Sequence, residues 1–154
     1  MDILFIKKEI DMVGFFIAML SGACMSIQGV FNTQVTKQTN SEWVTNVFVQ
    51  LSAFVVCFFV WLITDRSSFA ELFKVEPKYM LLGGSIGVVI TFTVIKSMSM
   101  LGPAKAVMVI VVTQLLIAYL IEVIGLFGVE KQPLEWKKIV ALALSIGGII
   151  LFKS

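Results

Sequence analysis

The sequence contains no histidine, and only 14% of its 154 residues are charged. Because histidine is the commonest general base and metal ligand, its absence argues against most hydrolytic and metal chemistry. We also find no nucleophile beside a base and no glycine loop of the kind that holds phosphate groups. We therefore expect no enzyme activity, no metal and no cofactor, and the net charge of +2 gives no reason to expect nucleic acid as a partner.

Cysteine is nearly as scarce, since Cys24 and Cys57 are the only two. Both fall in apolar runs, where a thiol acts most simply as a small apolar side chain. Two such residues do not form a disulfide framework, and no metal-ligand spacing accompanies them.

Apolar residues are what the chain has in abundance. They make up 58% of the sequence, and the mean hydropathy is +0.98. Soluble domains contain roughly 45–50% apolar and about 25% charged residues, so a soluble core of this size could not cover so much apolar surface. Lipid tails accept such surface. The composition predicts an all-α, polytopic membrane protein with a single domain.

Five apolar runs approach the roughly 20 residues that a membrane-spanning helix needs. Each should be helical, because unpaired backbone cannot face lipid. The predicted spans are residues 13–32, 43–64, 79–97, 104–127 and 136–152, which form one domain over residues 13–154 after an N-terminal extension of residues 1–12. Trp43 and Trp61 lie one membrane thickness apart in the second span, so each indole is expected at an interface.

Basic residues give a predicted orientation. With five spans, the N-terminal side of the membrane carries eight of them and the opposite side carries four. The positive-inside rule then places the N-terminus in the cytoplasm, for a multi-pass protein of the bacterial inner membrane. The first group is Lys7, Lys8, Arg66, Lys74, Lys78, Lys131, Lys137 and Lys138, and the second is Lys37, Lys96, Lys105 and Lys153.

Side-chain amides lie inside three of the predicted spans. Gln28 and Asn32 are four residues apart in the first span, as are Asn46 and Gln50 in the second, and Gln114 lies near the middle of the fourth. Residues four apart share one face of a helix. Each amide taken alone is explained well by an interhelical hydrogen bond. Amides on three helices of one small chain favour a shared polar cavity.

Glu122 is the only carboxylate well inside a predicted span, about 10 Å from the membrane midplane by helical rise. Tyr119 precedes it by three residues. An acid at this depth is a candidate proton carrier. The alternative is that Glu122 extends toward the interface or pairs with a basic loop residue such as Lys131.

Four segments resemble the YdcZ-type five-helix proteins, a branch of the drug/metabolite transporter superfamily related to the EamA-type carriers. In chain order they read SGACMSIQGVFNTQV, LGGSIGVVITF, VTQLLIAYLIEVIGLFG and SIGGIILF. The most specific positions are Gln28, Gly29 and Asn32, followed by Gln114 with the later Glu122, Gly125 and Gly128. Thr113 stands where the family more often has Gly, and Glu122 stands where it often has Asp.

The resemblance implies one half of an inverted-repeat transporter. Larger relatives contain two five-helix repeats of opposite topology, with the substrate site near the midplane between them. A five-helix chain would need an antiparallel second copy or a sister subunit. Small multidrug-resistance exporters also pair in this way, but they carry a glutamate in the first helix, where this chain has Gln28 and Asn32.

We therefore expect a secondary transporter that exports a small polar metabolite by alternating access. Gln28, Asn32, Gln50 and Gln114 would bind substrate, Asn46 and Tyr119 would support the cavity, and Glu122 would be a coupling acid or an ion-pair partner. The alternative is a membrane interaction subunit of a larger complex, which transports nothing itself.

Overall fold

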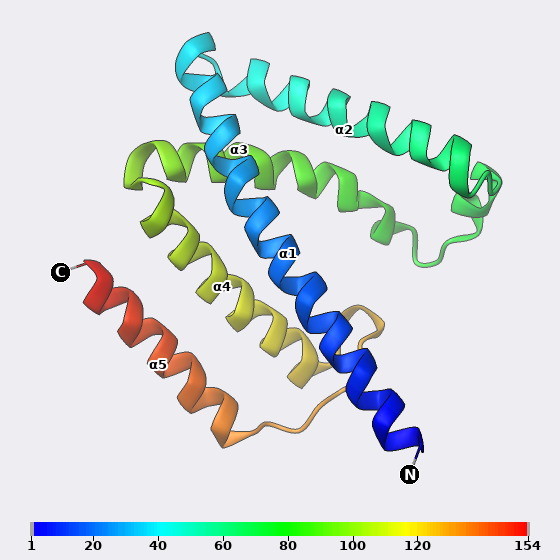
Figure 1. Cartoon of the computed structure of the whole chain (residues 1–154), viewed down its shortest axis with the longest axis vertical. Coiled ribbons are helices and arrows are strands. Elements are labelled where there is room, and N and C mark those ends of the chain that lie inside the picture. Colours follow the sequence, from blue (N-terminus) through cyan, green and yellow to red (C-terminus); the bar gives the residue numbers. More distant parts are fainter. Residues whose placement is uncertain (1, 154) are drawn as a thin grey trace. The chain divides into compact units, whose positions relative to one another are not determined.

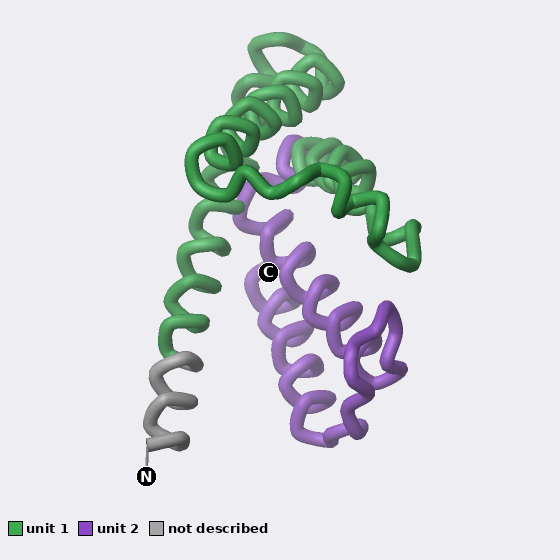
Figure 2. Tube along the Cα trace, turned by 90° about the vertical axis from the view of Figure 1, so that its right-hand side faces the viewer, with its two compact units in different colours: residues 1–96 green, residues 97–154 purple. Residues whose placement is uncertain are grey.

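The computed structural model describes the backbone of residues 2–153 and the side chains of residues 12–152. Every regular element in this part of the chain is a helix, which confirms the all-α prediction (Figure 1). The chain divides into two units, Met1–Lys96 and Ser97–Ser154 (Figure 2). The elements are α1 (Asp2–Thr39), α2 (Glu42–Thr64), η1 (Phe69–Lys74), η2 (Lys78–Leu82), α3 (Gly83–Leu101), α4 (Pro103–Ile124), η3 (Leu126–Gly128) and α5 (Trp136–Lys153).

Four helical segments of the described chain are long and apolar enough to cross a membrane. They are Met12–Thr39, Glu42–Thr64, Lys78–Leu101 and Pro103–Ile124. The helix α5 is not among them: it has 18 residues and begins with Trp136, Lys137 and Lys138. A multi-pass membrane protein is thus confirmed, whereas the count of five spans stays a prediction. The predicted N-terminal extension comprises residues 1–12 and includes Lys7 and Lys8. Its side chains before Met12 lie outside the described residues.

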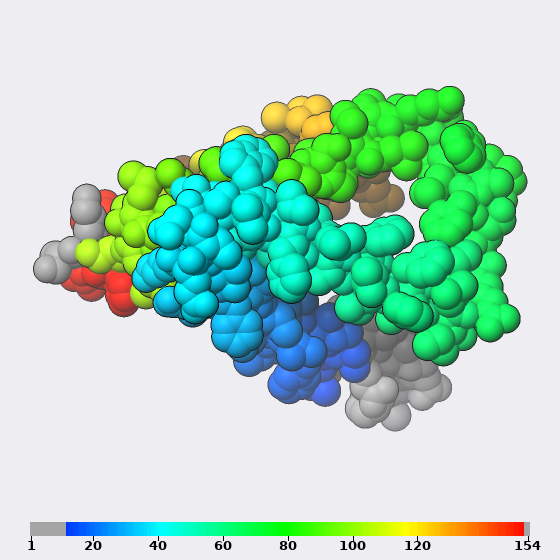
Figure 3. Space-filling view, turned by 90° about the horizontal axis from the view of Figure 1, so that it is seen from above, coloured from blue at the N-terminus to red at the C-terminus, as the bar shows by residue number. Residues whose placement is uncertain are grey.

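Large apolar side chains cover the helix surfaces instead of filling a core. Among the described residues, the buried apolar side chains are only Ile95, Met98, Ala106, Tyr119 and Leu142. Phe16 and Phe48 are both more than 60% exposed, and Figure 3 shows the surface of the described part of α1 in blue to cyan and that of α2 in cyan to turquoise. Surfaces of this kind are stable in lipid, whose tails are as apolar as the side chains.

The helix α1 continues past Asn32, the predicted end of its span, as far as Thr39. The polar residues after Asn32 do not end the helix, because a helix that leaves the apolar layer still satisfies its own backbone hydrogen bonds. Thr33 Oγ1 donates a hydrogen bond to the Gly29 carbonyl at 2.8 Å in this stretch. The apolar run therefore ends before the helix does.

A tight corner joins α1 to α2. Asn40 adopts a left-handed backbone with φ of 52°, and the Ser41 hydroxyl caps α2 by accepting from the Val44 N–H at 3.2 Å. Thr36 Oγ1 donates to Thr45 Oγ1 at 2.8 Å across the corner, and both threonines are buried. The hydrogen bond of these two side chains ties the last turns of α1 to the first turn of α2.

The helix α4 ends at Ile124, three residues before the predicted end at Phe127. Gly125 follows in the left-handed conformation, with φ of 77°, and its N–H donates to the Ile121 carbonyl at 2.8 Å. Glycine is the usual residue at this position because it has no Cβ to oppose a positive φ. The early end shortens α4 and moves Glu122 into its last turn.

Candidate functional site

The second helix is bound to the third through its two amides. Asn46 is buried, and its Nδ2 donates a hydrogen bond to the Val88 carbonyl oxygen at 2.9 Å. Gln50 Nε2 lies 3.3 Å from Thr91 Oγ1 and 3.4 Å from Asn46 Oδ1. In this unit α2 and α3 run side by side in opposite directions (Figure 1). The predicted pair Asn46 and Gln50 thus contributes an interhelical contact.

The same helix pair is joined near the start of α2 by an aromatic contact and an ion pair. The Trp43 ring stacks on Phe92 with centroids 4.8 Å apart. Glu42 Oε1 lies 2.9 Å from Lys96 Nζ. The interfacial indole expected at Trp43 is therefore also a packing residue between two helices.

The amides of α1 differ from those of α2 in having no partner. Gln28 is exposed and Asn32 is half-buried. Neither side chain makes a hydrogen bond to any other residue in the described part of the chain. An amide without a partner in the apolar layer is costly, so such residues face water, ligand or another subunit. This pair, and not the pair on α2, has free hydrogen-bonding capacity.

Gln114 lies on α4, in the second unit, and is exposed. Within the described residues its side chain also makes no hydrogen bond. The structure thus brings Asn46 and Gln50 together and places Gln28 and Asn32 on one face of α1, while Gln114 belongs to the other unit. A single cavity lined by all of the predicted amides stays a prediction.

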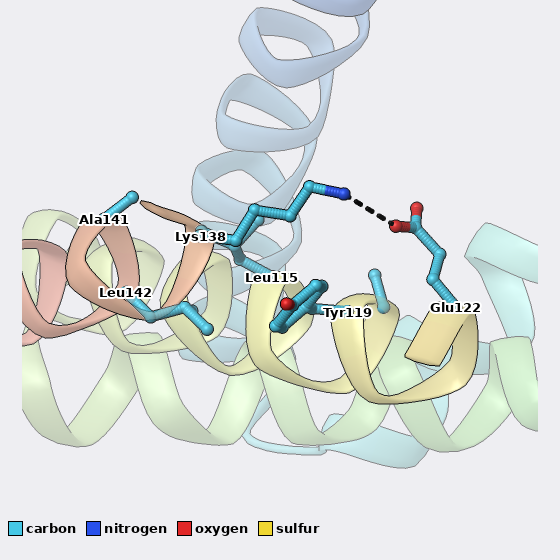
Figure 4. Close-up of a pocket in the computed structure, with 7 residues that line it drawn as sticks. Leu115, Tyr119, Glu122, Lys138, Ala141 and Leu142 are labelled. Carbon is cyan, nitrogen blue, oxygen red and sulfur yellow. Dashed lines mark ion pairs between the residues drawn. The ribbon is translucent and has the colours of Figure 1, made fainter. Parts of the chain in front are cut away.

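A pocket of about 360 Å³ lies between α4 and α5 (Figure 4). Its walls are mostly apolar, and its polar groups come from Tyr119, Glu122 and Lys138. Glu122 Oε2 lies 3.8 Å from Lys138 Nζ, and the two side chains are 45% and 41% exposed. The lining residues are Leu115, Ala118, Tyr119, Glu122, Lys138, Ala141 and Leu142.

Tyr119 forms a rigid part of this pocket. Its ring is buried, and its hydroxyl oxygen accepts a hydrogen bond from the Glu135 N–H at 2.8 Å. Lys138 Nζ lies 5.4 Å from the centre of the ring, within the range of a cation–π contact. The hydroxyl therefore anchors the segment before α5, while the ring face remains beside the charged pair.

Glu122 forms the ion pair that was one of its two predicted roles, but with a different lysine. The sequence pointed to Lys131 in the following loop, whereas Lys138 in the first turn of α5 is the residue within 4 Å. Lys138 was not identified as a site residue, because its closeness to Glu122 depends on how α5 packs against α4. Its position two residues after Trp136, at the start of a helix, was the only available signal.

The position of Glu122 within its helix also differs from the prediction. Since α4 ends at Ile124, Glu122 lies two residues from the helix end. A loop backbone group reaches it as well, because the Gln132 N–H donates to the Glu122 carbonyl at 2.9 Å. Glu122 and Lys138 therefore lie near one end of the α4–α5 pair. No group of three His, Cys, Asp or Glu side chains that could hold a metal occurs in the described ranges.

Comparison with known proteins identifies the chain over most of its length. The model of the family described as "Putative inner membrane exporter, YdcZ" matches residues 13–151. No curated protein and no solved structure matches the chain.

Proposed function

The chain belongs to the YdcZ-type family of inner membrane exporters, and from this we propose a secondary transporter that exports a small polar metabolite by alternating access. The family and the apolar helices make it a multi-pass membrane protein of a transporter family. A small polar substrate is favoured because the unpaired side chains of α1 are neutral amides, which donate and accept hydrogen bonds without requiring a charged ligand.

The observation that carries this proposal is the contrast between two amide pairs of equal spacing. Asn46 and Gln50 have partners on α3. Gln28 and Asn32 have none among the described residues, although they lie in a membrane helix. If α1 only packed against other helices, two unpaired amides on one of its faces would cost free energy without any compensating contact. We assign them to substrate, with Gln50 and Gln114 completing the cavity and Asn46 and Tyr119 supporting it.

The proposal includes a second five-helix chain of opposite orientation. Inverted repeats place substrate near the midplane at the interface between the repeats, and this chain holds one repeat. An antiparallel homodimer or a pair with a sister subunit would supply the other. The apolar and amide surfaces that α1 leaves uncovered are consistent with such a partner.

Glu122 is the proposed site of proton coupling, if the transport is driven by protons. Its pairing with Lys138 means that a proton would bind where an ammonium group already competes for the carboxylate. The basic residues favour a cytoplasmic N-terminus in at least one member of the dimer.

Transport by proteoliposomes tests the proposal. We would reconstitute the full chain, screen a panel of small polar metabolites by solid-supported-membrane currents, and measure flux of the hits. Gln28→Ala and Asn32→Ala should abolish flux while the protein keeps its helicity and its elution volume. Gln34→Ala is the matched control, because Gln34 is an exposed amide of the same helix outside the predicted span. Unchanged flux in both site variants would refute the assignment, and loss of folding would favour a purely structural role.

A further inference from the structure

The charged groups that line the α4–α5 pocket are one carboxylate and one ammonium. Glu122 and Lys138 face each other on its rim, and the rest of its lining is Tyr119 and four aliphatic side chains (Figure 4). Their charges cancel, so the pocket as it stands is neutral. A ligand that enters between them separates these two charges, and a ligand that carries both signs can pair with each of them.

The ion pair is weakly held. Its 3.8 Å separation exceeds the length of a direct hydrogen bond, and both side chains are more than two-fifths exposed. Pairs of this kind contribute little to stability. Lys138 also has a second carboxylate within reach, because its Nζ lies 3.5 Å from Glu135 Oε1. Lys138 can therefore turn away from Glu122 without losing every anionic neighbour.

We propose that this pocket binds a small zwitterion, with the cationic end of the ligand at Glu122 and its anionic end at Lys138. A zwitterion replaces the internal pair by two new pairs, so no charge is left bare. A simple anion at Lys138 would lie beside the Glu122 carboxylate, and a simple cation at Glu122 would lie beside the Lys138 ammonium, which then has only Glu135 as a partner. A zwitterion pairs with both groups at once, so the pocket favours it over a ligand of a single sign.

The remaining walls fit a ligand of this class. The Tyr119 ring, which already lies 5.4 Å from Lys138 Nζ, offers its face to a ligand cation. Because the Tyr119 hydroxyl is held by the Glu135 N–H, the ring is in place before the ligand arrives. Ala118 and Ala141 are small, and the volume of about 360 Å³ is at the lower end for ligand sites, which limits the ligand to a short molecule.

This inference names a substrate class for the transport function proposed above and depends on that function for its physiological meaning. Binding can be tested without transport. We would use three compounds of equal chain length, namely 4-aminobutyrate, 4-hydroxybutyrate and 4-amino-1-butanol, which are a zwitterion, an anion and a cation. Saturation-transfer NMR on the full chain in nanodiscs detects weak binding of each one.

The wild-type protein should bind 4-aminobutyrate in preference to the other two. Glu122→Gln should weaken its binding roughly ten- to hundredfold, the scale of one charged hydrogen bond, and shift the preference to 4-hydroxybutyrate. Lys138→Gln should weaken it similarly and shift the preference to 4-amino-1-butanol. Lys105→Gln is the matched control, because Lys105 lines a separate α4–α5 cavity.

A charge-swapped protein, Glu122→Lys with Lys138→Glu, keeps one charge of each sign and should keep the preference for the zwitterion. This double variant keeps the inference testable even if the single variants fail to fold. Equal binding of the three compounds by the wild type, or no binding of any, would overturn the inference. Parallel flux measurements separate the two proposals. Binding of 4-aminobutyrate that Glu122→Gln and Lys138→Gln weaken, without any flux in proteoliposomes, supports this inference and removes only the transport function.

Discussion

The side-chain amide of Asn46 donates a hydrogen bond to the backbone carbonyl of Val88, 2.9 Å away on the neighbouring helix. Val88 lies within α3, so its carbonyl oxygen accepts a hydrogen bond from the Asn46 side chain in addition to its part in the backbone hydrogen bonding of the helix. Asn46 is 1% exposed, and its Oδ1 lies 3.4 Å from Gln50 Nε2. The contact makes Asn46 the centre of the polar interface between α2 and α3.

Replacing Asn46 by alanine should therefore destabilise the protein. We expect a loss of about 1–2 kcal/mol, because the variant removes a buried interhelical hydrogen bond. Thermal unfolding in detergent, followed by circular dichroism, measures the change. Gln28→Ala is the control and should leave the unfolding temperature unchanged, since Gln28 has no partner among the described residues. Equal destabilisation by both variants would contradict the distinction between the two amide pairs.

Gly125→Ala should also destabilise the protein, for a backbone reason. Gly125 has φ of 77°, where an L side chain costs about 1–2 kcal/mol. The added Cβ would also lie 3.2 Å from Lys131 Cβ. Gly84→Ala is the matched control, because Gly84 lies in α3 with open space around its missing side chain and should tolerate the change. A Gly125→Ala protein that unfolds at the temperature of the wild type would refute the left-handed helix end.

Tyr119→Phe should loosen the segment between α4 and α5. The change leaves the buried ring in place and removes only the hydroxyl that accepts from the Glu135 N–H. We expect a loss of about 1 kcal/mol, the usual value of one hydrogen bond. Limited proteolysis of the protein in detergent should then cut the segment before Trp136 faster than in the wild type. An unchanged cutting rate would show that the hydroxyl does not hold this segment.

A reporter fused after Ser154 tests the proposed dimer. Signal from both sides of the membrane would indicate dual topology, which an antiparallel homodimer requires. Signal from one side would mean that the second repeat comes from a sister subunit. A C-terminus on the same side as the N-terminus in every molecule would contradict the prediction of five spans, because an odd number of spans separates the two ends.

The helices were predictable because backbone that faces lipid must satisfy its own hydrogen bonds, so long apolar runs have little alternative to the helix. Their ends were harder to locate. Apolar residues continue through Leu126 and Phe127, yet α4 stops at Ile124 because Gly125 takes a left-handed conformation. At the other end of the chain, α1 runs on through polar residues as far as Thr39.

The site was predictable only in part, since spacing along one helix says nothing about the neighbouring helix. Gln28 and Asn32 have the same spacing as Asn46 and Gln50, but only the second pair meets donors and acceptors of α3. Lys138 was missed for the same reason. Its closeness to Glu122, sixteen residues earlier in the chain, comes from the packing of α5 on α4.

The hydroxyl contact between Thr36 and Thr45 limits how a transporter of this architecture can move. The corner at Asn40 is short, and the two buried threonines on either side of it are hydrogen-bonded to each other. These contacts hold α1 and α2 at a fixed angle. Two helices joined in this way are expected to move as one rigid body. A conformational change that opens the site to one side of the membrane would then move Gln28 and Asn32 together with the whole of α2.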